Sequence, residues 1–374
     1  AAMHDISTDE VRTSLRTYFA DHPGIAEVRH NRDATDQTGR TAAGFDVAGW
    51  RTLSEQVGIT GLGTPESWGG LQLPAAHLVA AAEECGATLY PGPVRATLLL
   101  SAALVGVDPD AVPTQEREVV ESILAGSAVV GTPTGDNTLT YADGRVSGRL
   151  GAVTHGAVAH VIVASVSTPQ GPALALIHTG DARIERTSVP GVDLVVPLAD
   201  IAFSDTPALL LTTPADAGAL ARHHRLETML LAAEQVGGAQ GCLTGMVEYA
   251  KVREQFGQVI GTYQAISHRC AHTAVATSAA RALVVAAADA HDADNASAAE
   301  QIVLLARAQA ADTYSDASSA LIQVSGGIGF TWEHDAHLHF RHARATAAIG
   351  GTPDQFRDRA VTAGCLDLLT PGAA

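Results

Sequence analysis

Apolar residues recur with a helical period near both ends of the chain, and they form short β-branched runs in the middle. After residue 215, Leu226, Leu230, Ala233, Gly237 and Gly241 fall on one stripe with steps of three and four. This pattern predicts long helices at about residues 216–254, 264–290 and 296–324. Residues 5–122 also read as mostly helical, and a Gly/Pro-rich connection interrupts them at residues 58–70.

Residues 123–214 have a different character. Apolar, β-branched runs occur at residues 129–130, 157–165, 173–178, 192–197 and 200–203, and Asp143-Gly144 is a two-residue hairpin signal. Strands spaced by roughly ten residues are typical of a small antiparallel barrel or sandwich. We therefore expect an α+β protein with a helical domain at residues 1–122, a β domain at 123–214 and a second helical domain at 215–374.

Charge and composition exclude several classes of function. The net charge of −17 over 374 residues disfavours binding to nucleic acid and to anionic membranes. Lys251 is the only lysine, so cationic roles belong to arginine, and no Gly-Lys-Ser/Thr phosphate loop is present. The N-terminal residues carry no signal-peptide pattern and no uncharged apolar stretch is long enough to span a bilayer. Four scattered cysteines without CxxC spacing fit a reducing cytoplasm.

Two segments of the second helical region carry the candidate chemistry. They are Lys251-Val-Arg-Glu-Gln-Phe-Gly257 and Gln323-Val-Ser-Gly-Gly-Ile-Gly-Phe330. In this order they resemble the flavin-binding signatures of acyl-CoA dehydrogenases, and weaker similarity covers nearly the whole chain. The resemblance implies an N-terminal helical domain, a β-barrel and a C-terminal four-helix bundle. It also implies FAD-dependent α,β-dehydrogenation of an acyl-CoA or acyl-carrier thioester, with electrons passed to an electron-transferring flavoprotein.

The same resemblance assigns residues to the cofactor. A guanidinium fork suits a pyrophosphate, and glycines let backbone N–H groups approach phosphate closely. By similarity to the family, Val153-Thr-His-Gly156 places Thr154 beside the flavin N5 atom, and Thr352 follows the late loop of the site. The remaining residues expected to contact FAD are Arg253, Gln255, Phe256, Ile260, Tyr263, Gln323, Val324, Gly326 and Gly327.

The catalytic base is expected at an unusual place. Most of the family keeps a glutamate in an Ile-Tyr-Glu-Gly-Thr string, where this chain has Ala348-Ile-Gly-Gly-Thr352, so that Gly350 occupies the position. The isovaleryl-CoA dehydrogenase branch instead keeps a glutamate 26 residues before the flavin-clamp arginine, and Glu227 has this spacing from Arg253. We expect Glu227, with a pKa raised by burial, to abstract the α-proton. The Gly350 N–H would remain a donor to the thioester oxygen.

Helix geometry adds an expectation about assembly. In a continuous helix Glu227 and Arg253 lie about 39 Å apart at 1.5 Å per residue. One flavin cannot comfortably reach both, so the clamp should serve the FAD of a neighbouring subunit. The chain is therefore expected to form a homo-oligomer, or a heteromer with a related subunit.

Two alternatives remain open. Ala152 replaces a family tryptophan, and the Thr-Glu-Pro-Gly string is only faintly present around Gly131-Thr-Pro133. These departures, with the missing late glutamate, suit a non-catalytic or half-site subunit. The segment Leu89-Tyr-Pro-Gly-Pro93 resembles a bacterial subgroup, some of whose members act on steroid side-chain thioesters as two-gene heteromers. A flavin oxidase or monooxygenase on the same fold is the other alternative. No metal site is expected, because the histidines between 334 and 342 spread around a helix.

Overall fold

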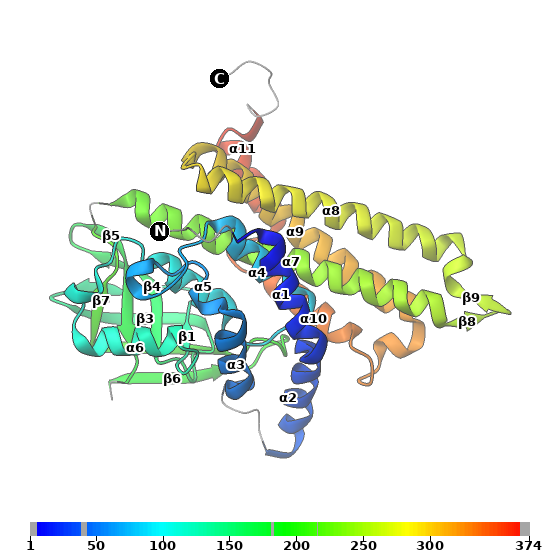
Figure 1. The fold of residues 1–374 in the computed structure, drawn as a ribbon, viewed down its shortest axis with the longest axis horizontal. Coiled ribbons are helices and arrows are strands. Elements are labelled where there is room, and N and C mark those ends of the chain that lie inside the picture. Colours follow the sequence, from blue (N-terminus) through cyan, green and yellow to red (C-terminus); the bar gives the residue numbers. More distant parts are fainter. Residues whose placement is uncertain (1–5, 39–42, 181–182, 215, 367–374) are drawn as a thin grey trace.

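The computed structural model describes residues 6–38, 43–180, 183–214 and 216–366, and it places a β-barrel between two groups of helices along the chain (Figure 1). The first helix starts at a capping box, in which Ser7 and Glu10 satisfy each other's backbone N–H groups. The N-terminal helices are α1 (Thr8–Asp21), α2 (Gly24–Thr38), α3 (Val47–Val57), α4 (Ala75–Ala87), α5 (Val94–Ala103) and α6 (Thr114–Leu124), with single turns at Ile59–Gly61, Glu66–Trp68 and Pro109–Ala111.

The middle strands close into a barrel. Strands β4, β2, β3, β7 and β5 are neighbours in this order, and β5 pairs back with β4. Asp143 and Gly144 join β2 to β3 with positive φ angles of 51° and 78°, as a tight hairpin requires. Strand β4 pairs in parallel with β1 and β2, so the barrel is mostly antiparallel. The strands are β1 (Val130–Gly131), β2 (Thr140–Ala142), β3 (Arg145–Thr154), β4 (Val161–Thr168), β5 (Gly171–His178), β6 (Ile184–Val189) and β7 (Leu198–Leu210).

One expected strand is wrong. Residues 192–197 form no strand, and the edge strand next to β7 is β6 instead. The apolar run at 192–197 is buried for a different reason, because Val195 packs with Val28 and Leu338 of two surrounding helices and with Leu89, just after α4. Its hydrophobicity therefore reflects a contact between barrel and helices, which a local pattern cannot distinguish from a strand.

Three long helices dominate the C-terminal half, and their ends lie within two residues of those predicted. They are α7 (Ala217–Val252), α8 (Gln264–Asp292) and α9 (Ala296–Ser325); α10 (Ala336–Ala347) and α11 (Pro353–Thr362) follow, with short strands β8 (Glu254–Gln255) and β9 (Gln258–Val259) and single turns at Ile260–Thr262 and Gly326–Phe330. Helix α4 packs closely on α7. A Cβ atom at Gly237 would lie 1.9 Å from the Glu83 carbonyl oxygen, so only glycine permits this approach.

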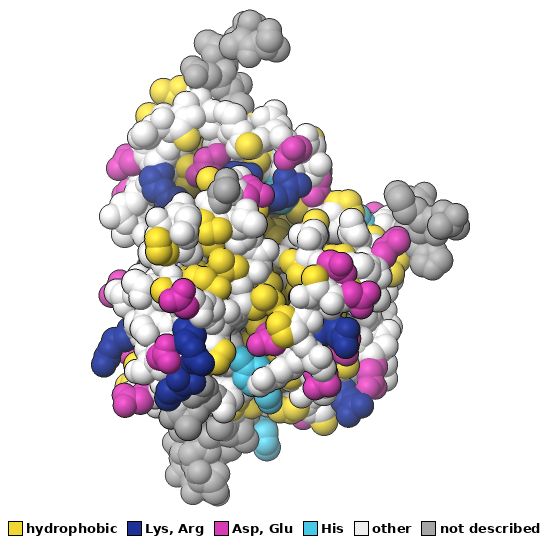
Figure 2. All heavy atoms as spheres, turned by 90° about the vertical axis from the view of Figure 1, so that its left-hand side faces the viewer, with side chains coloured by type: hydrophobic (Ala, Val, Ile, Leu, Met, Phe, Trp, Pro, Cys, Tyr) yellow, Lys and Arg dark blue, Asp and Glu magenta, His cyan; other side chains and the backbone are white. Residues whose placement is uncertain are grey.

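Helix α8 is, within the described part of the chain, the one helix long and apolar enough to cross a membrane. Here it lies along α9 and α7 (Figure 1), and its Arg281 pairs with the buried Glu83 of α4 at 2.6 Å. On the face shown in Figure 2, basic side chains are separated and mixed with acidic ones, without a broad basic patch. This face offers no surface of the kind that binds a phosphate backbone.

Candidate active site

Thr154 lies at the end of β3, where the backbone is unusually constrained. A register shift between Leu150 and Val153 precedes it, and Ala152 and His155 on either side have left-handed φ angles of 49° and 53°. Such angles are uncommon for residues other than glycine and concentrate at functional sites. The buried Thr154 hydroxyl exchanges hydrogen bonds of 3.2 Å with the backbone N–H and carbonyl of Thr132. The side chain is therefore held in one orientation.

A cavity of about 220 Å³ separates Thr154 from the end of α10. Ala348 and Ile349 line it from the far side, directly before Gly350. Gly350 is exposed and has a φ of +74°, a conformation that glycine adopts without strain. Thr352 begins α11, and its hydroxyl accepts a hydrogen bond from the Gln355 N–H. The structure thus brings Thr154 and the turn that carries Gly350 to one cavity.

Glu227 lies on α7 beside the barrel and is not among the residues that line this cavity. Its side chain is 30 % exposed, and its carboxylate is 3.4 Å from Nδ1 of His224, whose Nε2 is 3.1 Å from the Ser165 hydroxyl of β4. Burial favours a raised pKa for Glu227, but the hydrogen bond from His224 and the charges of His223 and Arg95 lower the pKa below its ordinary value. The expectation of a raised pKa is therefore wrong, because nearby cationic groups outweigh burial.

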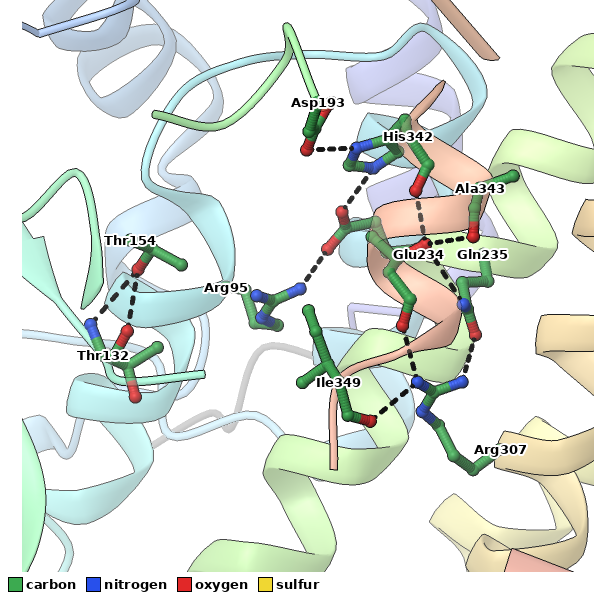
Figure 3. A network of polar contacts seen from close by, with 11 residues as sticks. Arg95, Thr132, Thr154, Asp193, Glu234, Gln235, Arg307, His342, Ala343 and Ile349 are labelled. Atoms are coloured by element: carbon green, nitrogen blue, oxygen red, sulfur yellow. Dashed lines mark hydrogen bonds and ion pairs between the residues drawn. The ribbon is translucent and has the colours of Figure 1, made fainter. Parts of the chain in front are cut away.

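Four charged side chains that the sequence analysis did not assign to the site surround the cavity (Figure 3). Asp193 is 3.0 Å from Nδ1 of His342, and Glu234 bridges Nε2 of His342 and the Arg95 guanidinium, both at 2.9 Å. We call these four residues the buried charge chain. Burial opposes the charges of Asp193, Glu234 and His342, yet the two carboxylates raise the pKa of His342 to about 10, and Arg95 and His342 lower the pKa of Glu234 to about 2. Asp193, Glu234 and His342 are therefore charged at neutral pH.

One sequence feature pointed to the buried charge chain, namely the position of Glu234. Glu234 follows Glu227 by seven residues, which puts both on one face of α7. Glu234 also interrupts an apolar stretch of the helix, where an acid is rarely buried without a cationic partner. The sequence analysis considered the histidines between 334 and 342 only as candidate metal ligands, and it missed that the ion pairs of His342 form a wall of the cavity. Arg95 and Asp193 had no local signal.

The arginine segment expected to bind the cofactor lies at the opposite end of α7. Arg253 follows the last residue of the helix, and Gln255 begins a hairpin that turns at Phe256 and Gly257. Phe256 is 94 % exposed and has a left-handed φ of 54°. Such a conformation costs a bulky residue about 1–3 kcal/mol and persists where function requires it. The structure therefore presents an aromatic ring and a guanidinium outward at this end.

The side chains after the hairpin hold it in place. Ile260 is buried, and the Tyr263 hydroxyl donates a 3.0 Å hydrogen bond to the carbonyl of Gln255. Ile260 and Tyr263 pack with Leu321 and Val324 of α9 in one apolar cluster. The same apolar cluster therefore holds both the arginine segment and the end of α9 that carries Gln323.

The glycine loop after α9 is open to approach. Val324 is buried and can offer only its backbone, whereas Cβ atoms added at Gly326 or Gly327 would meet nothing within 4 Å. Gln323 lines a cavity of about 500 Å³ together with Arg341 and Arg344, two cations that the sequence analysis did not single out. Exposed backbone and guanidinium groups suit a diphosphate. Both segments thus fit the anionic half of FAD, and the arginine segment lies at the end of the bundle far from the barrel (Figure 1).

Comparison with known proteins agrees with this architecture. Residues 222–361 match the family model of the acyl-CoA dehydrogenase C-terminal domain. The acyl-CoA dehydrogenase IpdE2 of Mycobacterium tuberculosis is 33 % identical over 344 residues, covering 92 % of each chain. Among solved structures, a variant of the Tcur3481–Tcur3483 steroid ACAD matches with a TM-score of 0.83 at 22 % identity over 97 % of this chain and 99 % of that one.

A second solved structure shows the same fold over the full length. It is the ChsE4–ChsE5 complex from Mycobacterium tuberculosis, with a TM-score of 0.80 at 22 % identity and complete coverage of both chains. Helices, barrel and bundle, the cavity at Thr154 and the extent of the match to IpdE2 all point the same way. The chain belongs to the acyl-CoA dehydrogenase family, and it is an acyl-CoA dehydrogenase.

Proposed function

We propose that the protein catalyses FAD-dependent α,β-dehydrogenation of an acyl thioester, and that each chain contributes to two different flavins. The observation that carries this proposal is the single uninterrupted α7. It puts Glu227 beside the barrel and Arg253 at the far end, about 39 Å away for 26 residues of ideal helix. Thr154 therefore belongs to one flavin and the exposed clamp to another, so the functional unit is at least a dimer.

The roles of the residues follow from their chemistry. Thr154 and the turn at Gly350 flank the isoalloxazine, while Arg253, Gln255, Phe256 and the loop at Gln323 hold the diphosphate and adenine of the neighbour's FAD. The remaining residues assigned to this cofactor half are Ile260, Tyr263, Val324, Gly326 and Gly327, whereas Thr352 belongs with the turn at Gly350. When bound, the flavin supplies an acceptor for the hydride that leaves the β-carbon.

The proton transfer belongs to the chain itself. Glu227, ionised at neutral pH because its pKa is lowered, takes the α-proton. The electrons of the broken Cα–H bond form the new double bond as the β-hydrogen departs with its electron pair, which gives the 2-enoyl thioester. Gly350 donates its N–H to the thioester oxygen as negative charge develops there. Thr154 fixes the position of the acceptor.

The partners follow from the same proposal. The reduced flavin is reoxidised by an electron-transferring flavoprotein in the cytoplasm, and the second chain is another copy or a related subunit. A relative from Acetobacterium woodii is named as CarC, a subunit of a caffeyl-CoA reductase–Etf complex, and is 32 % identical over a third of this chain. The ChsE4–ChsE5 neighbour is a two-protein complex. Both support assembly with a flavoprotein or with a related chain.

The test is the substitution Glu227→Gln. It removes the base without changing the size of the side chain, so turnover of a competent thioester should be lost while the flavin absorbance of the purified protein stays. Glu248→Gln is the matched control, because Glu248 is an exposed acid on the same helix, and it should keep wild-type activity. Wild-type turnover by Glu227→Gln would end the assignment of the base.

A second candidate is a half-site subunit that completes the flavin site of a different chain. It is favoured by the buried charge chain, which presents ions where an acyl group would need apolar walls. On the α4–α5 side of Arg95 the enclosed space is only about 40 Å³. Protein that is colourless alone but yellow and active with a related subunit would favour this candidate. Hydrogen peroxide formation with a thioester under oxygen would instead indicate an oxidase.

A further inference from the structure

Arg307 in the middle of α9 is one of the largest fully buried side chains, with 1 % of its surface exposed. Its guanidinium donates three hydrogen bonds (Figure 3). One reaches the side-chain oxygen of Gln235 at 2.9 Å, and the other two reach the backbone carbonyls of Thr346 at 2.7 Å and Ile349 at 3.0 Å. The ring of Phe356 lies 5.1 Å from the guanidinium carbon. Both terminal nitrogens of the planar fork are thus engaged, without a lysine-like freedom to move.

The partners of Arg307 are all neutral. None of the ion pairs between described residues includes it, although an isolated buried cation is costly unless something compensates for it. Burial, with repulsion from Arg95, lowers the pKa of Arg307 to about 10, while Glu234 acts in the opposite direction. The group therefore stays protonated at neutral pH. A buried cation bonded to neutral groups invites a functional explanation.

Its backbone partners identify what it holds. Thr346 is in the last turn of α10 and Ile349 directly precedes Gly350, so Arg307 binds carbonyls at the negative end of that helix. Both residues line the cavity that Thr154 faces. Two of the three hydrogen bonds therefore fix the path of the chain into the turn at Gly350, and Arg307 itself is not among the residues that line the cavity.

The charge of Arg307 is not balanced by the charged side chains around it. In the buried charge chain, the carboxylates of Asp193 and Glu234 balance the cations His342 and Arg95. Arg307 is one positive charge beyond that balance. The excess lies behind the turn that carries Gly350, the proposed donor to the thioester oxygen. A fixed positive charge at that place stabilises an anion formed during the reaction more than the neutral ground state.

We propose that Arg307 is the positioning residue for the Gly350 N–H donor: it fixes the Thr346–Ile349 carbonyls and thereby the orientation of the turn. This inference rests on the proposed dehydrogenation. Arg307 touches neither thioester nor flavin in this account. It acts through Gly350, so its loss should lower the rate of the chemical step and leave binding of the thioester nearly unchanged.

The experiment is a double-mutant cycle in the full chain, with any subunit needed for activity. Arg307→Lys keeps the charge but loses the fork, and Gly350→Ala misaligns the N–H. At Gly350 a Cβ atom would meet Phe356 at an ordinary 3.4 Å, so the strain of the positive φ is the main effect. Each single substitution should lower kcat by about 10- to 100-fold, because misaligning an oxyanion donor costs less than the roughly 100- to 1000-fold of removing one, with KM changed less than about threefold. The double variant should be little slower than the slower single variant.

Arg281→Lys provides the control. Arg281 is also an arginine in a long helix, but it pairs with Glu83 and Gln240, away from the cavity at Thr154. It should leave kcat unchanged and combine additively with Gly350→Ala. If Arg307→Lys does not fold, Gln235→Met removes one acceptor of the same guanidinium, and it should again lower kcat rather than raise KM.

The outcomes separate the two proposals. If the wild-type protein, alone or with a related subunit, does not convert any thioester and its flavin absorbance is not bleached, the proposed function is wrong, and this inference with it. Wild-type turnover with additive effects of Arg307→Lys and Gly350→Ala contradicts only the role of Arg307. The same holds if Arg307→Lys loses thermal stability but keeps its kcat.

Discussion

The two halves of α7 solve different problems with the same helix. In the half beside the barrel, which we call the barrel end, Glu234 in the middle of the helix has both of its carboxylate oxygens paired, with His342 and with Arg95. At the far end, Arg253 and Phe256 are exposed, and Phe256 holds a strained backbone conformation. The first end is complete within one chain. The second presents an exposed guanidinium and an exposed aromatic ring, which is the arrangement expected of a surface completed by another molecule.

The comparison predicts unequal consequences of substitution, and the largest is at the barrel end. Glu234→Ala leaves Arg95 and His342 buried without their shared partner, so it should lower the free energy of unfolding by about 3–5 kcal/mol. Urea denaturation measures the loss. Glu248→Ala on the exposed side of α7 should stay within about 0.5 kcal/mol of wild type. A similar small loss for Glu234→Ala would mean that the barrel end is not held by charge.

The far end should respond in binding and not in folding. Arg253→Ala removes a charge-assisted contact to a diphosphate and should weaken FAD binding by about 10- to 100-fold, or 1.4–2.7 kcal/mol. Flavin titration followed by fluorescence measures this, and the thermal midpoint of the flavin-free protein should not change. Lys251→Ala, another exposed cation at the same helix end, should bind FAD normally. Equal losses for both would indicate general electrostatic attraction in place of a clamp.

The smallest expected effect is a change of the free energy of unfolding with pH, caused by His342 beside the barrel end of α7. The folded pKa of His342 is raised to about 10, against an unfolded value of about 6.5. Its contribution is fully present below the unfolded value and is lost as pH rises toward 10, by up to about 1.4 kcal/mol per pH unit. Unfolding free energies at pH 7 and 8, below the range where thiols ionise, should show this fall. His342→Gln should flatten the slope, and the exposed His268→Gln should keep it.

Much of the architecture could be predicted because the local period of apolar residues indicates where helices and strands lie. The helical stripe through Leu226 and Leu230 located α7, and the Asp143-Gly144 pair located a hairpin. The run at 192–197 was predicted as a strand because Val195 is as apolar as any strand residue. Its burial comes from Val28, Leu89 and Leu338, which are far away in sequence. A local pattern predicts whether a segment is a helix or a strand, but it does not predict which distant residues pack against it.

The residues of the candidate site also fall into those that local sequence could predict and those that it could not. The segments at Arg253 and Gln323 are contiguous strings, so they could be found by resemblance, and the structure brings both to one end of the bundle. The buried charge chain joins α5, the loop before β7, α7 and α10, and no short window contains it. The pKa of Glu227 also depends on Arg95 and His223, so the expected direction of its shift was wrong.

By itself the sequence determined the order of helices, strands and helices, the length of α7 and hence the separation of Glu227 from Arg253, because rise per residue and periodicity are local properties. The tertiary structure decided which charges meet. Asp193, His342, Glu234 and Arg95 come from four separate segments, and Arg307 reaches the Gly350 turn only because α9 and α10 pack together. Electrostatic energies depend on distances through space, and only the folded chain sets those distances.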